Sequence, residues 1–211
     1  MIKTLIFDLG GVIVNINRDE AVRRFYELGV KDISSRLNDY AQTGVFGDFE
    51  RGALSGEQFR LKMCKMTGRE ITTEQCSHAW RGFIAEIPQR NLELLDSLRE
   101  RHYRLILLSN TNEFIMAWAE SEAFDGRGRA LHTYFDAEYK SFEQKMLKPD
   151  PGFFSLVIQK EGINPQEAIF LDDGLKNVQS AASVGLHTFQ PVNGEDWRQR
   201  FEDLLHSLNQ N

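Results

Sequence analysis

The sequence predicts an open α/β fold, doubly wound around a mainly parallel sheet. Two observations lead to this prediction. Short, continuous apolar runs that stop at glycine or at polar residues recur along the chain, and helical periodicities separate them. A continuous apolar run of this length is typical of a strand buried on both faces, as in a parallel sheet. Strands that alternate with helices indicate the α/β class.

Four apolar runs supply the predicted strands. The first run is rich in residues that favour strands, and each run ends where turn-forming or polar residues begin. The runs are residues 4–9 before Gly10-Gly11, residues 105–108 before Ser109-Asn110, residues 168–171 before Asp172-Asp173-Gly174, and residues 188–189 before Pro191.

Helical periodicity fills the stretches between these strands. Leu92, Leu95 and Leu98 are spaced three residues apart before the second run. A similar pattern predicts a helix over residues 153–160, before the third run, and another over residues 177–184, after it.

Residues 16–87 interrupt the alternation of strand and helix. They show helical periods and no convincing strand, so we expect a helical insertion after the first strand, with residues 1–15 and 88–211 forming the α/β core. Two amphipathic stripes support this expectation: Ala21, Val22, Phe25 and Leu28, and then Cys76, Ala79, Trp80, Phe83 and Ile87.

Size and charge limit the classes of function. A chain of 211 residues is long enough for one sizeable domain, or for one domain that carries a small insertion. The formal net charge is -6, which does not favour binding to a polyanion, so we expect no nucleic-acid partner. A phosphorylated substrate would need local positive charge from a metal ion, a lysine or backbone amides.

Cysteine usage and hydropathy indicate a compartment. Cys64 and Cys76 both fall in helical stretches, and their spacing fits neither a disulfide framework nor a zinc site, so we expect a reducing cytoplasm. Asp8 interrupts the N-terminal apolar run, unlike the core of a signal peptide. No run approaches the roughly 18 apolar residues of a membrane span, so no membrane partner is expected.

Polar residues gather at the carboxyl ends of three predicted strands, as Asp8, Ser109-Asn110 and Asp172-Asp173. In an open α/β sheet, ligands bind in the crevice outside these ends, so the three clusters should face one site. Acids that converge there would repel one another strongly without a cation. Mg²⁺ prefers oxygen ligands and keeps several waters, so we predict a magnesium site.

Four motifs resemble those of a known enzyme family. In chain order they are FDLGGVIV, LLSNTN, KPDPGFF and FLDDGLKN, and together they resemble the motifs of the haloacid dehalogenase superfamily of hydrolases. The resemblance covers the whole chain and implies a Rossmann-like core with a helical, C1-type cap at residues 16–87. The motifs are most similar to those of a branch of sugar-phosphate phosphatases that includes bacterial α-glucose-1-phosphate phosphatases.

The resemblance implies a catalytic and metal-binding set. Asp8 would attack phosphorus and form an aspartyl-phosphate, which splits the hydrolysis into two easier steps. Lys148 would pair with Asp8 and with the phosphate, and would neutralise the transition state. Mg²⁺ would be bound by Asp8, by the backbone carbonyl of Gly10 and directly by Asp173, while Asp172 would act through a metal-bound water.

The same resemblance implies groups that bind a phosphorylated substrate. The pair Gly10-Gly11 would let the backbone turn tightly beside the phosphate. The Ser109 hydroxyl would donate a hydrogen bond to a phosphoryl oxygen, and the amide of Asn110 would do the same at the start of a helix, a natural anion site. Lys148 would add its charge. The expected partner is a small phosphate ester, most simply a sugar phosphate.

Two positions depart from the pattern of the family. Many relatives carry a second aspartate, a general acid, at the position where this chain has Gly10. General acid–base catalysis typically contributes about 10²–10⁴ in rate, so a cap residue or an ordered water would have to supply the proton. Lys145 stands where the family often has glycine, and it either adds charge to the site or points to solvent.

We expect the phosphatase to act as a monomer or small homo-oligomer. Two alternatives to the phosphatase function remain. A haloacid-type dehalogenase also lacks the second aspartate, but it needs no metal, and the acid pair Asp172-Asp173 favours the magnesium enzyme. A non-catalytic phosphate-binding relative is the other alternative. The complete set of Asp8, Lys148 and Asp173 argues against it, because a protein that only binds phosphate needs no nucleophile.

Overall fold

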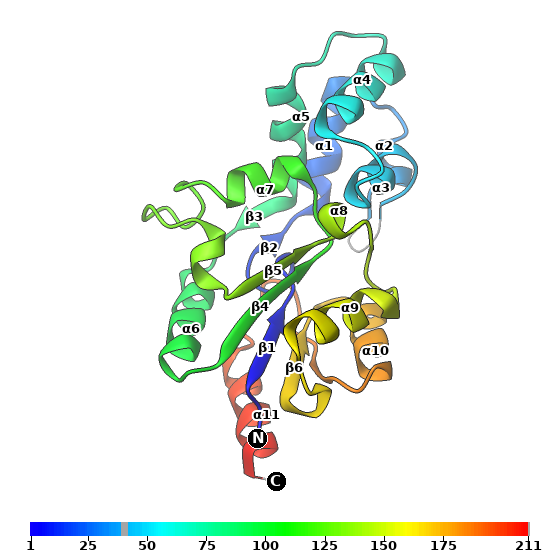
Figure 1. The fold of residues 1–211 in the computed structure, drawn as a ribbon. Helices are drawn as coiled ribbons and strands as arrows, with labels where there is room; N and C mark the ends of the chain where they lie inside the picture. The colour runs from blue at the N-terminus through cyan, green and yellow to red at the C-terminus, as the bar shows by residue number, and fades with distance from the viewer. Residues whose placement is uncertain (39–41, 211) are drawn as a thin grey trace.

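The computed structural model describes residues 1–38 and 42–210 and has a five-stranded parallel sheet at its centre (Figure 1). The strands lie in the spatial order β5–β4–β1–β6–β7. Their bounds are β1 (Thr4–Phe7), β4 (Arg104–Ser109), β5 (Ala137–Lys140), β6 (Ala168–Leu171) and β7 (His187–Phe189). The predicted open α/β sheet is confirmed, and the four apolar runs are β1, β4, β6 and β7.

The register of the sheet brings the ends of neighbouring strands together. Phe7 of β1 lies opposite Leu107 of β4 on one side and opposite Leu171 of β6 on the other. The chain therefore leaves β1 at Asp8 beside the point where it leaves β6 at Asp172. Because all strand pairs in this sheet are parallel, the last residues of β4 emerge at the same edge.

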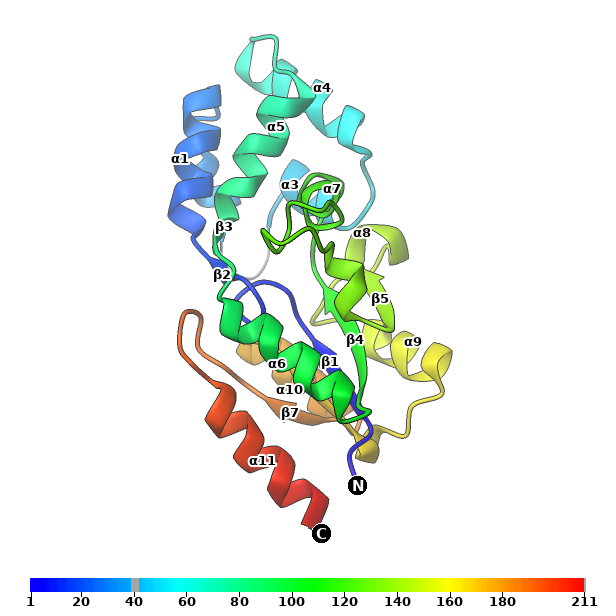
Figure 2. The same ribbon diagram turned by 90° about the vertical axis from the view of Figure 1, so that its left-hand side faces the viewer.

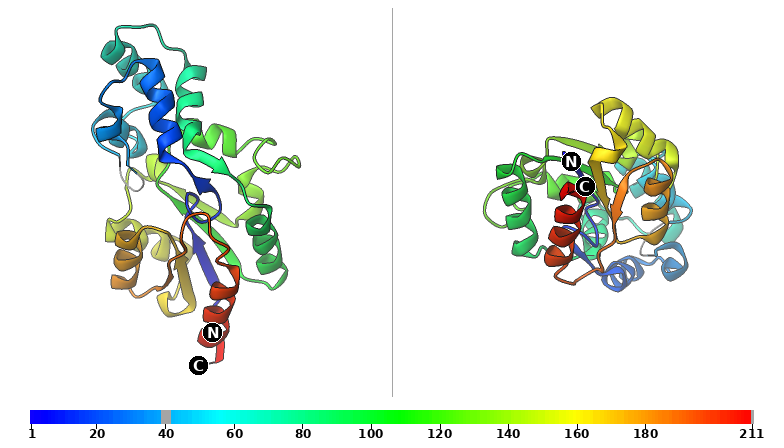
Figure 3. Two further views of the ribbon diagram at one scale, coloured as in Figure 1. Left: turned by 180° about the vertical axis from the view of Figure 1, so that it is seen from behind. Right: turned by 90° about the horizontal axis from the view of Figure 1, so that it is seen from below.

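Helices cover both faces of the sheet (Figures 2 and 3). Those on one face are α6 (Gln89–Glu100) and α11 (Arg198–Gln210), and those on the other are α9 (Pro151–Glu161) and α10 (Leu175–Ser183). Neighbouring residues of β1 belong to two different cores. Phe7 packs in the core with α6 and α11, and Ile6 packs in the core with α9 and α10. This alternation explains why β1 is apolar on both faces.

Shorter helices connect the remaining strands. They are α7 (Glu113–Ala119), η2 (Leu131–Tyr134), α8 (Ser141–Gln144) and η3 (Pro165–Glu167). The side chain of Asn112 accepts hydrogen bonds from the backbone N–H groups of Phe114 and Ile115, which starts α7 soon after β4 ends. Every helix within residues 1–38 and 42–210 is too short or too polar to span a membrane.

A helical segment lies beyond the carboxyl edge of the sheet, at the top of Figure 1. Its elements are α1 (Arg18–Leu28), α2 (Ile33–Arg36), α3 (Val45–Glu50), α4 (Gly56–Thr67), α5 (Thr73–Trp80) and η1 (Arg81–Phe83). Capping boxes at Ser55 and Thr72 begin α4 and α5. The segment has an aromatic core, in which the Phe25 ring lies 5.0 Å from the Phe46 ring and 5.6 Å from the Trp80 ring.

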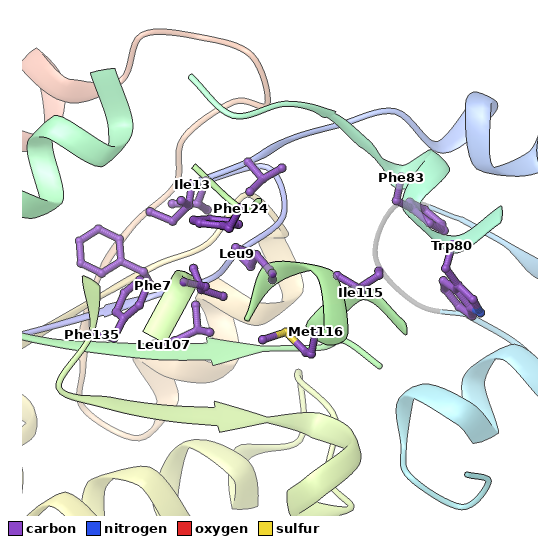
Figure 4. Close-up of a cluster of buried hydrophobic side chains, with 14 of the residues drawn as sticks. Phe7, Leu9, Ile13, Trp80, Phe83, Leu107, Ile115, Met116, Phe124 and Phe135 are labelled. Carbon is purple, nitrogen blue, oxygen red and sulfur yellow. The ribbon is translucent and has the colours of Figure 1, made fainter. Parts of the chain in front are cut away.

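Three strands differ from the predictions. The segment joins the sheet through a short antiparallel ribbon of β2 (Asn15–Ile16) and β3 (Ile84–Glu86), although no strand was predicted within residues 16–87. The second predicted stripe, which begins at Cys76, lies in an α-helix only as far as Trp80. Phe83 follows in η1, immediately before β3 (Figure 4). The edge strand β5 was also not predicted, because its sequence AEYK is not an apolar run.

Direct contacts join the helical segment to the sheet domain. The Ser141 hydroxyl of α8 donates a hydrogen bond to the carbonyl oxygen of Glu50 at 2.7 Å. The backbone N–H of Gly56 donates to the carboxylate of Glu113 in α7 at 2.9 Å. The ring of Phe49 lies 5.1 Å from that of Phe114. These contacts hold α3 and the start of α4 against the carboxyl edge of the sheet.

Candidate active site

One cavity lies between the carboxyl edge of the sheet and the helical segment. Six residues predicted from the sequence line it: Asp8, Gly10, Ser109, Asn110, Lys148 and Asp173. The other two predicted residues lie directly behind its wall, since Asp172 is fully buried against Lys148 and Gly11 lies against Asp173. The fold therefore brings all the residues predicted for the site together.

Three carboxylates converge at this cavity. Asp8, Asp172 and Asp173 each offer one oxygen, and these oxygens lie within 4.8 Å of one another. Burial, together with the charges of Asp8 and Asp172, raises the pKa of Asp173 to about 8. Burial also raises the pKa of Asp8 to about 6, although the charge of Lys148 lowers it. A cation that prefers carboxylate oxygens would relieve this repulsion, so the donor set fits Mg²⁺.

Lys148 places a positive charge beside the predicted nucleophile. Its ammonium lies 3.0 Å from Asp8 Oδ1 and 2.6 Å from Asp172 Oδ2. Burial lowers the pKa of this ammonium, but the charges of Asp172 and Asp8 outweigh burial and raise it. The Asn110 side chain fixes the Lys148 backbone, because it donates to the carbonyl oxygen and accepts from the N–H, both at 2.9 Å.

Asn177 is a site residue to which the sequence analysis assigned no role. From α10, its side-chain amide donates to both carboxylate oxygens of Asp172, at 2.9 and 3.1 Å. The backbone N–H of Gly174 donates to the same carboxylate at 2.8 Å. Asp172 is thus held by three donors, counting Lys148, while Asp173 faces the cavity. The signal was available, because Asn177 belongs to the motif FLDDGLKN.

Gly11 occupies a position that no other residue could take without strain. Its φ angle is +71°, in the left-handed region, and a Cβ atom there would lie 2.1 Å from Asp173 Oδ2. The loop after Asp8 therefore packs directly against the Asp173 carboxylate. Gly10 lines the cavity itself, where a Cβ atom would lie 3.2 Å from Ile16 Cγ2.

The cavity also contains polar residues that were not predicted. Thr111 follows Asn110 in the motif LLSNTN, and Glu50 comes from the last turn of α3. No motif marks Glu50, and its presence at the site results from the way the helical segment packs. Lys145 lies at the exposed end of α8 and is not among the cavity residues, which agrees with the solvent-facing alternative.

We expect Asp173→Asn to stabilise the metal-free protein. The folded-state pKa of Asp173, about 8, lies above its ordinary value of 3.8, so its ionisation increasingly opposes folding as the pH rises between these values. A neutral amide avoids this cost. At pH 8 in EDTA, the variant should melt at least about 2–4 °C above wild type, which corresponds to about 1 kcal/mol in a chain of this size.

Mg²⁺ should no longer raise the melting temperature of the Asp173→Asn variant. Mg²⁺ should raise the melting temperature of wild type, because a ligand that binds only the folded state stabilises it. Thermal melts followed by circular dichroism, with and without Mg²⁺, measure both effects. A variant that melts below wild type in EDTA, or gains as much from Mg²⁺ as wild type does, would contradict this view of Asp173.

Comparison with known proteins identifies relatives over nearly the whole chain. A family model described as haloacid dehalogenase-like (HAD-like) hydrolase matches residues 2–185. A D-ribitol-5-phosphate phosphatase of Bacteroides thetaiotaomicron is 44% identical over 207 residues, which cover 98% of this chain and 100% of that protein.

Two solved structures are similar in fold and sequence. A HAD-like family hydrolase from Porphyromonas gingivalis superposes with a TM-score of 0.92 at 41% identity, covering 97% of this chain and 98% of that chain. A HAD family enzyme from Bacteroides thetaiotaomicron, in complex with magnesium and inorganic phosphate, superposes with a TM-score of 0.87 at 36% identity. This match covers 95% of the present chain and 100% of the other.

Proposed function

Because this chain belongs to the haloacid dehalogenase-like hydrolase family, we propose that it is a Mg²⁺-dependent phosphatase that hydrolyses a small sugar phosphate. The observation that carries this proposal is the convergence of Asp8, Lys148 and Asp173 at one cavity. A nucleophile, a fixed positive charge beside it and an oxygen-rich metal site are the parts that phosphoryl transfer requires.

We assign the first chemical step to Asp8. A carboxylate oxygen attacks phosphorus, the bond to the alcohol oxygen of the substrate breaks, and an aspartyl-phosphate forms. The Leu9 N–H, at 2.7 Å, and the Lys148 ammonium both bind Asp8 Oδ1 and fix the orientation of the carboxylate. Ser109 and the backbone amide of Asn110 would bind phosphoryl oxygens. Water then hydrolyses the aspartyl-phosphate and restores Asp8.

Asp8, Asp173 and the Gly10 carbonyl would hold Mg²⁺, with Asp172 acting through a metal-bound water. When bound, the ion supplies positive charge that orients the phosphate and offsets the charge of the transition state. The raised pKa values of Asp8 and Asp173 support this assignment, because a cation would keep both carboxylates ionised.

We assign residues 16–87 as a cap over a catalytic core of residues 1–15 and 88–211. Support comes from the cavity, because Glu50 and Phe83 of the segment line it together with residues of the sheet edge. A cap that covers a reaction site excludes bulk water and large substrates. The substrate is therefore small, and the cap residues contribute to its selection.

The similarity to a D-ribitol-5-phosphate phosphatase supports a phosphate of a sugar or sugar alcohol as the substrate. We propose a reducing cytoplasm as the compartment, which the free thiols of Cys64 and Cys76 support. A monomer or small homo-oligomer remains the predicted state of assembly.

A phosphate-release panel tests the proposed function. D-Ribitol 5-phosphate, α-glucose 1-phosphate, further sugar phosphates and p-nitrophenyl phosphate are incubated with Mg²⁺ or with EDTA, and halide release from a 2-haloacid is measured in parallel. We expect hydrolysis of at least one sugar phosphate with Mg²⁺ and loss of that activity in EDTA. Halide release that persists in EDTA would instead support a dehalogenase, and an inactive protein across the panel would contradict the proposal.

A further inference from the structure

Hydrolysis of a phosphate ester in this cavity requires a proton donor that the predicted residues do not supply. The alkoxide of a sugar is a poor leaving group, so its oxygen must gain a proton as its bond to phosphorus breaks. Asp8 serves as nucleophile, Asp173 is assigned to the metal, and Lys148 is paired with Asp172. Gly10 offers no side chain.

Glu50 is a carboxylic acid at the right place. It is the last residue of α3, it is only 6% exposed, and it lines the same cavity as Asp8. It does not belong to the group of three carboxylates whose oxygens converge. A role outside the metal site is therefore open to it.

The surroundings of Glu50 favour a carboxyl group that carries a proton. Among the described residues, none donates a hydrogen bond to its carboxylate or forms an ion pair with it. Burial, and then the negative charge of Asp8, raises the pKa of Glu50 to about 8. A buried, unpaired carboxylate is costly, so a structural role alone does not explain an acid at this position.

The backbone of Glu50 is held firmly against the sheet domain. The Ser141 hydroxyl donates to the Glu50 carbonyl oxygen at 2.7 Å and accepts a hydrogen bond from the Thr111 N–H at 2.9 Å. Two residues later, the chain passes so close to Phe142 that a Cβ atom on Gly52 would lie 1.9 Å from the Phe142 carbonyl oxygen. One hydroxyl thus links Glu50 to the loop after β4, which contributes Asn110 and Thr111 to the same cavity.

We propose that Glu50, carried into the site by the helical cap, is the general acid and base of the reaction; this inference rests on the phosphatase function proposed above. In the first step, Asp8 attacks phosphorus, the bond between phosphorus and the ester oxygen breaks, and the Glu50 carboxyl proton passes to that oxygen. The alcohol leaves, and Glu50 becomes a carboxylate.

In the second step, the Glu50 carboxylate takes a proton from water as the water oxygen attacks phosphorus. The bond between phosphorus and the Asp8 oxygen breaks, phosphate leaves, and both side chains return to their starting forms. The second step begins with Glu50 ionised, and departure of the neutral alcohol makes room for the water.

Glu50→Gln tests this role, because it keeps the shape of the side chain and removes the proton. The variant is assayed on the best sugar phosphate of wild type and on p-nitrophenyl phosphate, whose nitrophenolate leaves without protonation. For the sugar phosphate, kcat/KM should fall about 10²–10⁴-fold. For the aryl ester, the first turnover should stay close to wild type and be followed by slow turnover, with nitrophenolate released in a burst while the aspartyl-phosphate accumulates.

Two further variants complete the test. Asp48→Asn changes an exposed carboxylate on the same helix and should leave both activities unchanged. Glu50→Asp keeps an acid and should recover part of the sugar-phosphate activity that Glu50→Gln loses. Equal losses of first-turnover rate on both esters, or no loss on either, would overturn the proposal. Failure of the phosphatase function itself looks different, because wild type would then hydrolyse neither ester.

Discussion

Asp8→Asn is expected to lower phosphate release at least about 10⁴-fold, because single substitutions of a covalent nucleophile cause losses of that order. An amide cannot attack phosphorus, and the variant therefore forms no aspartyl-phosphate. Phosphate release in the presence of Mg²⁺ measures the rate, and acid quenching with a ³²P-labelled substrate measures the covalent intermediate. Wild type should retain label after quenching, and the variant should retain none.

A matched control separates this loss from unfolding. Asp203→Asn makes the same chemical change on an exposed face of α11, a helix that contributes no residue to the cavity. This variant should leave the rate of phosphate release unchanged. The far-ultraviolet circular dichroism of both variants should match that of wild type. Residual activity in Asp8→Asn within tenfold of wild type would exclude Asp8 as the nucleophile.

Lys148→Met should reduce both activity and stability. Its ammonium neutralises the buried carboxylates of Asp8 and Asp172, and removing one partner of a buried ion pair costs about 3–5 kcal/mol in the free energy of unfolding. Loss of one fixed positive contact to the transition state lowers the rate by about 10²–10³ or more. Urea denaturation and phosphate release measure the two effects.

The exposed lysine three positions earlier supplies the control. Lys145→Met removes the same charge from the end of α8, outside the cavity, and should change neither quantity appreciably. If Lys145→Met were the variant that lost activity, the positive charge would act on the substrate from the surface, and the assignment of Lys148 would be wrong.

The sequence predicts the interior strands because their surroundings are uniform. β1, β4 and β6 are covered by a strand on each side and by helices on both faces, so nearly every residue is apolar. β5 lies at the edge, where Glu138 is half-buried and the ammonium of Lys140 pairs with Glu120 and Glu138. Such a strand has no apolar run, and β2 and β3 are too short to show a period.

The same reasoning explains which site residues could be predicted. Asp8 follows β1 directly, the pair Asp172-Asp173 follows β6, and the parallel register alone brings these residues together. Glu50 reaches the cavity only because the helical segment folds back and is bonded to Ser141, 91 residues further along the chain. A contact between residues so far apart in the chain leaves no local pattern in the sequence. The sequence therefore indicates only that a cap residue or an ordered water would supply the proton, and it does not single out Glu50.

The central position of β1 has a consequence for how the protein is made. Thr4 lies opposite Arg104 and Ala168, so β1, which leads to the proposed nucleophile Asp8, can pair only with strands that are synthesised much later. Pairings of such long sequence separation form slowly, and until then the apolar faces and both edges of β1 are uncovered. The helices of residues 16–87 can form through local contacts in that interval. A nascent chain that ends before β6 therefore lacks Asp172 and Asp173, two residues of the proposed metal site, and leaves one edge of β1 unpaired, where the chain can aggregate.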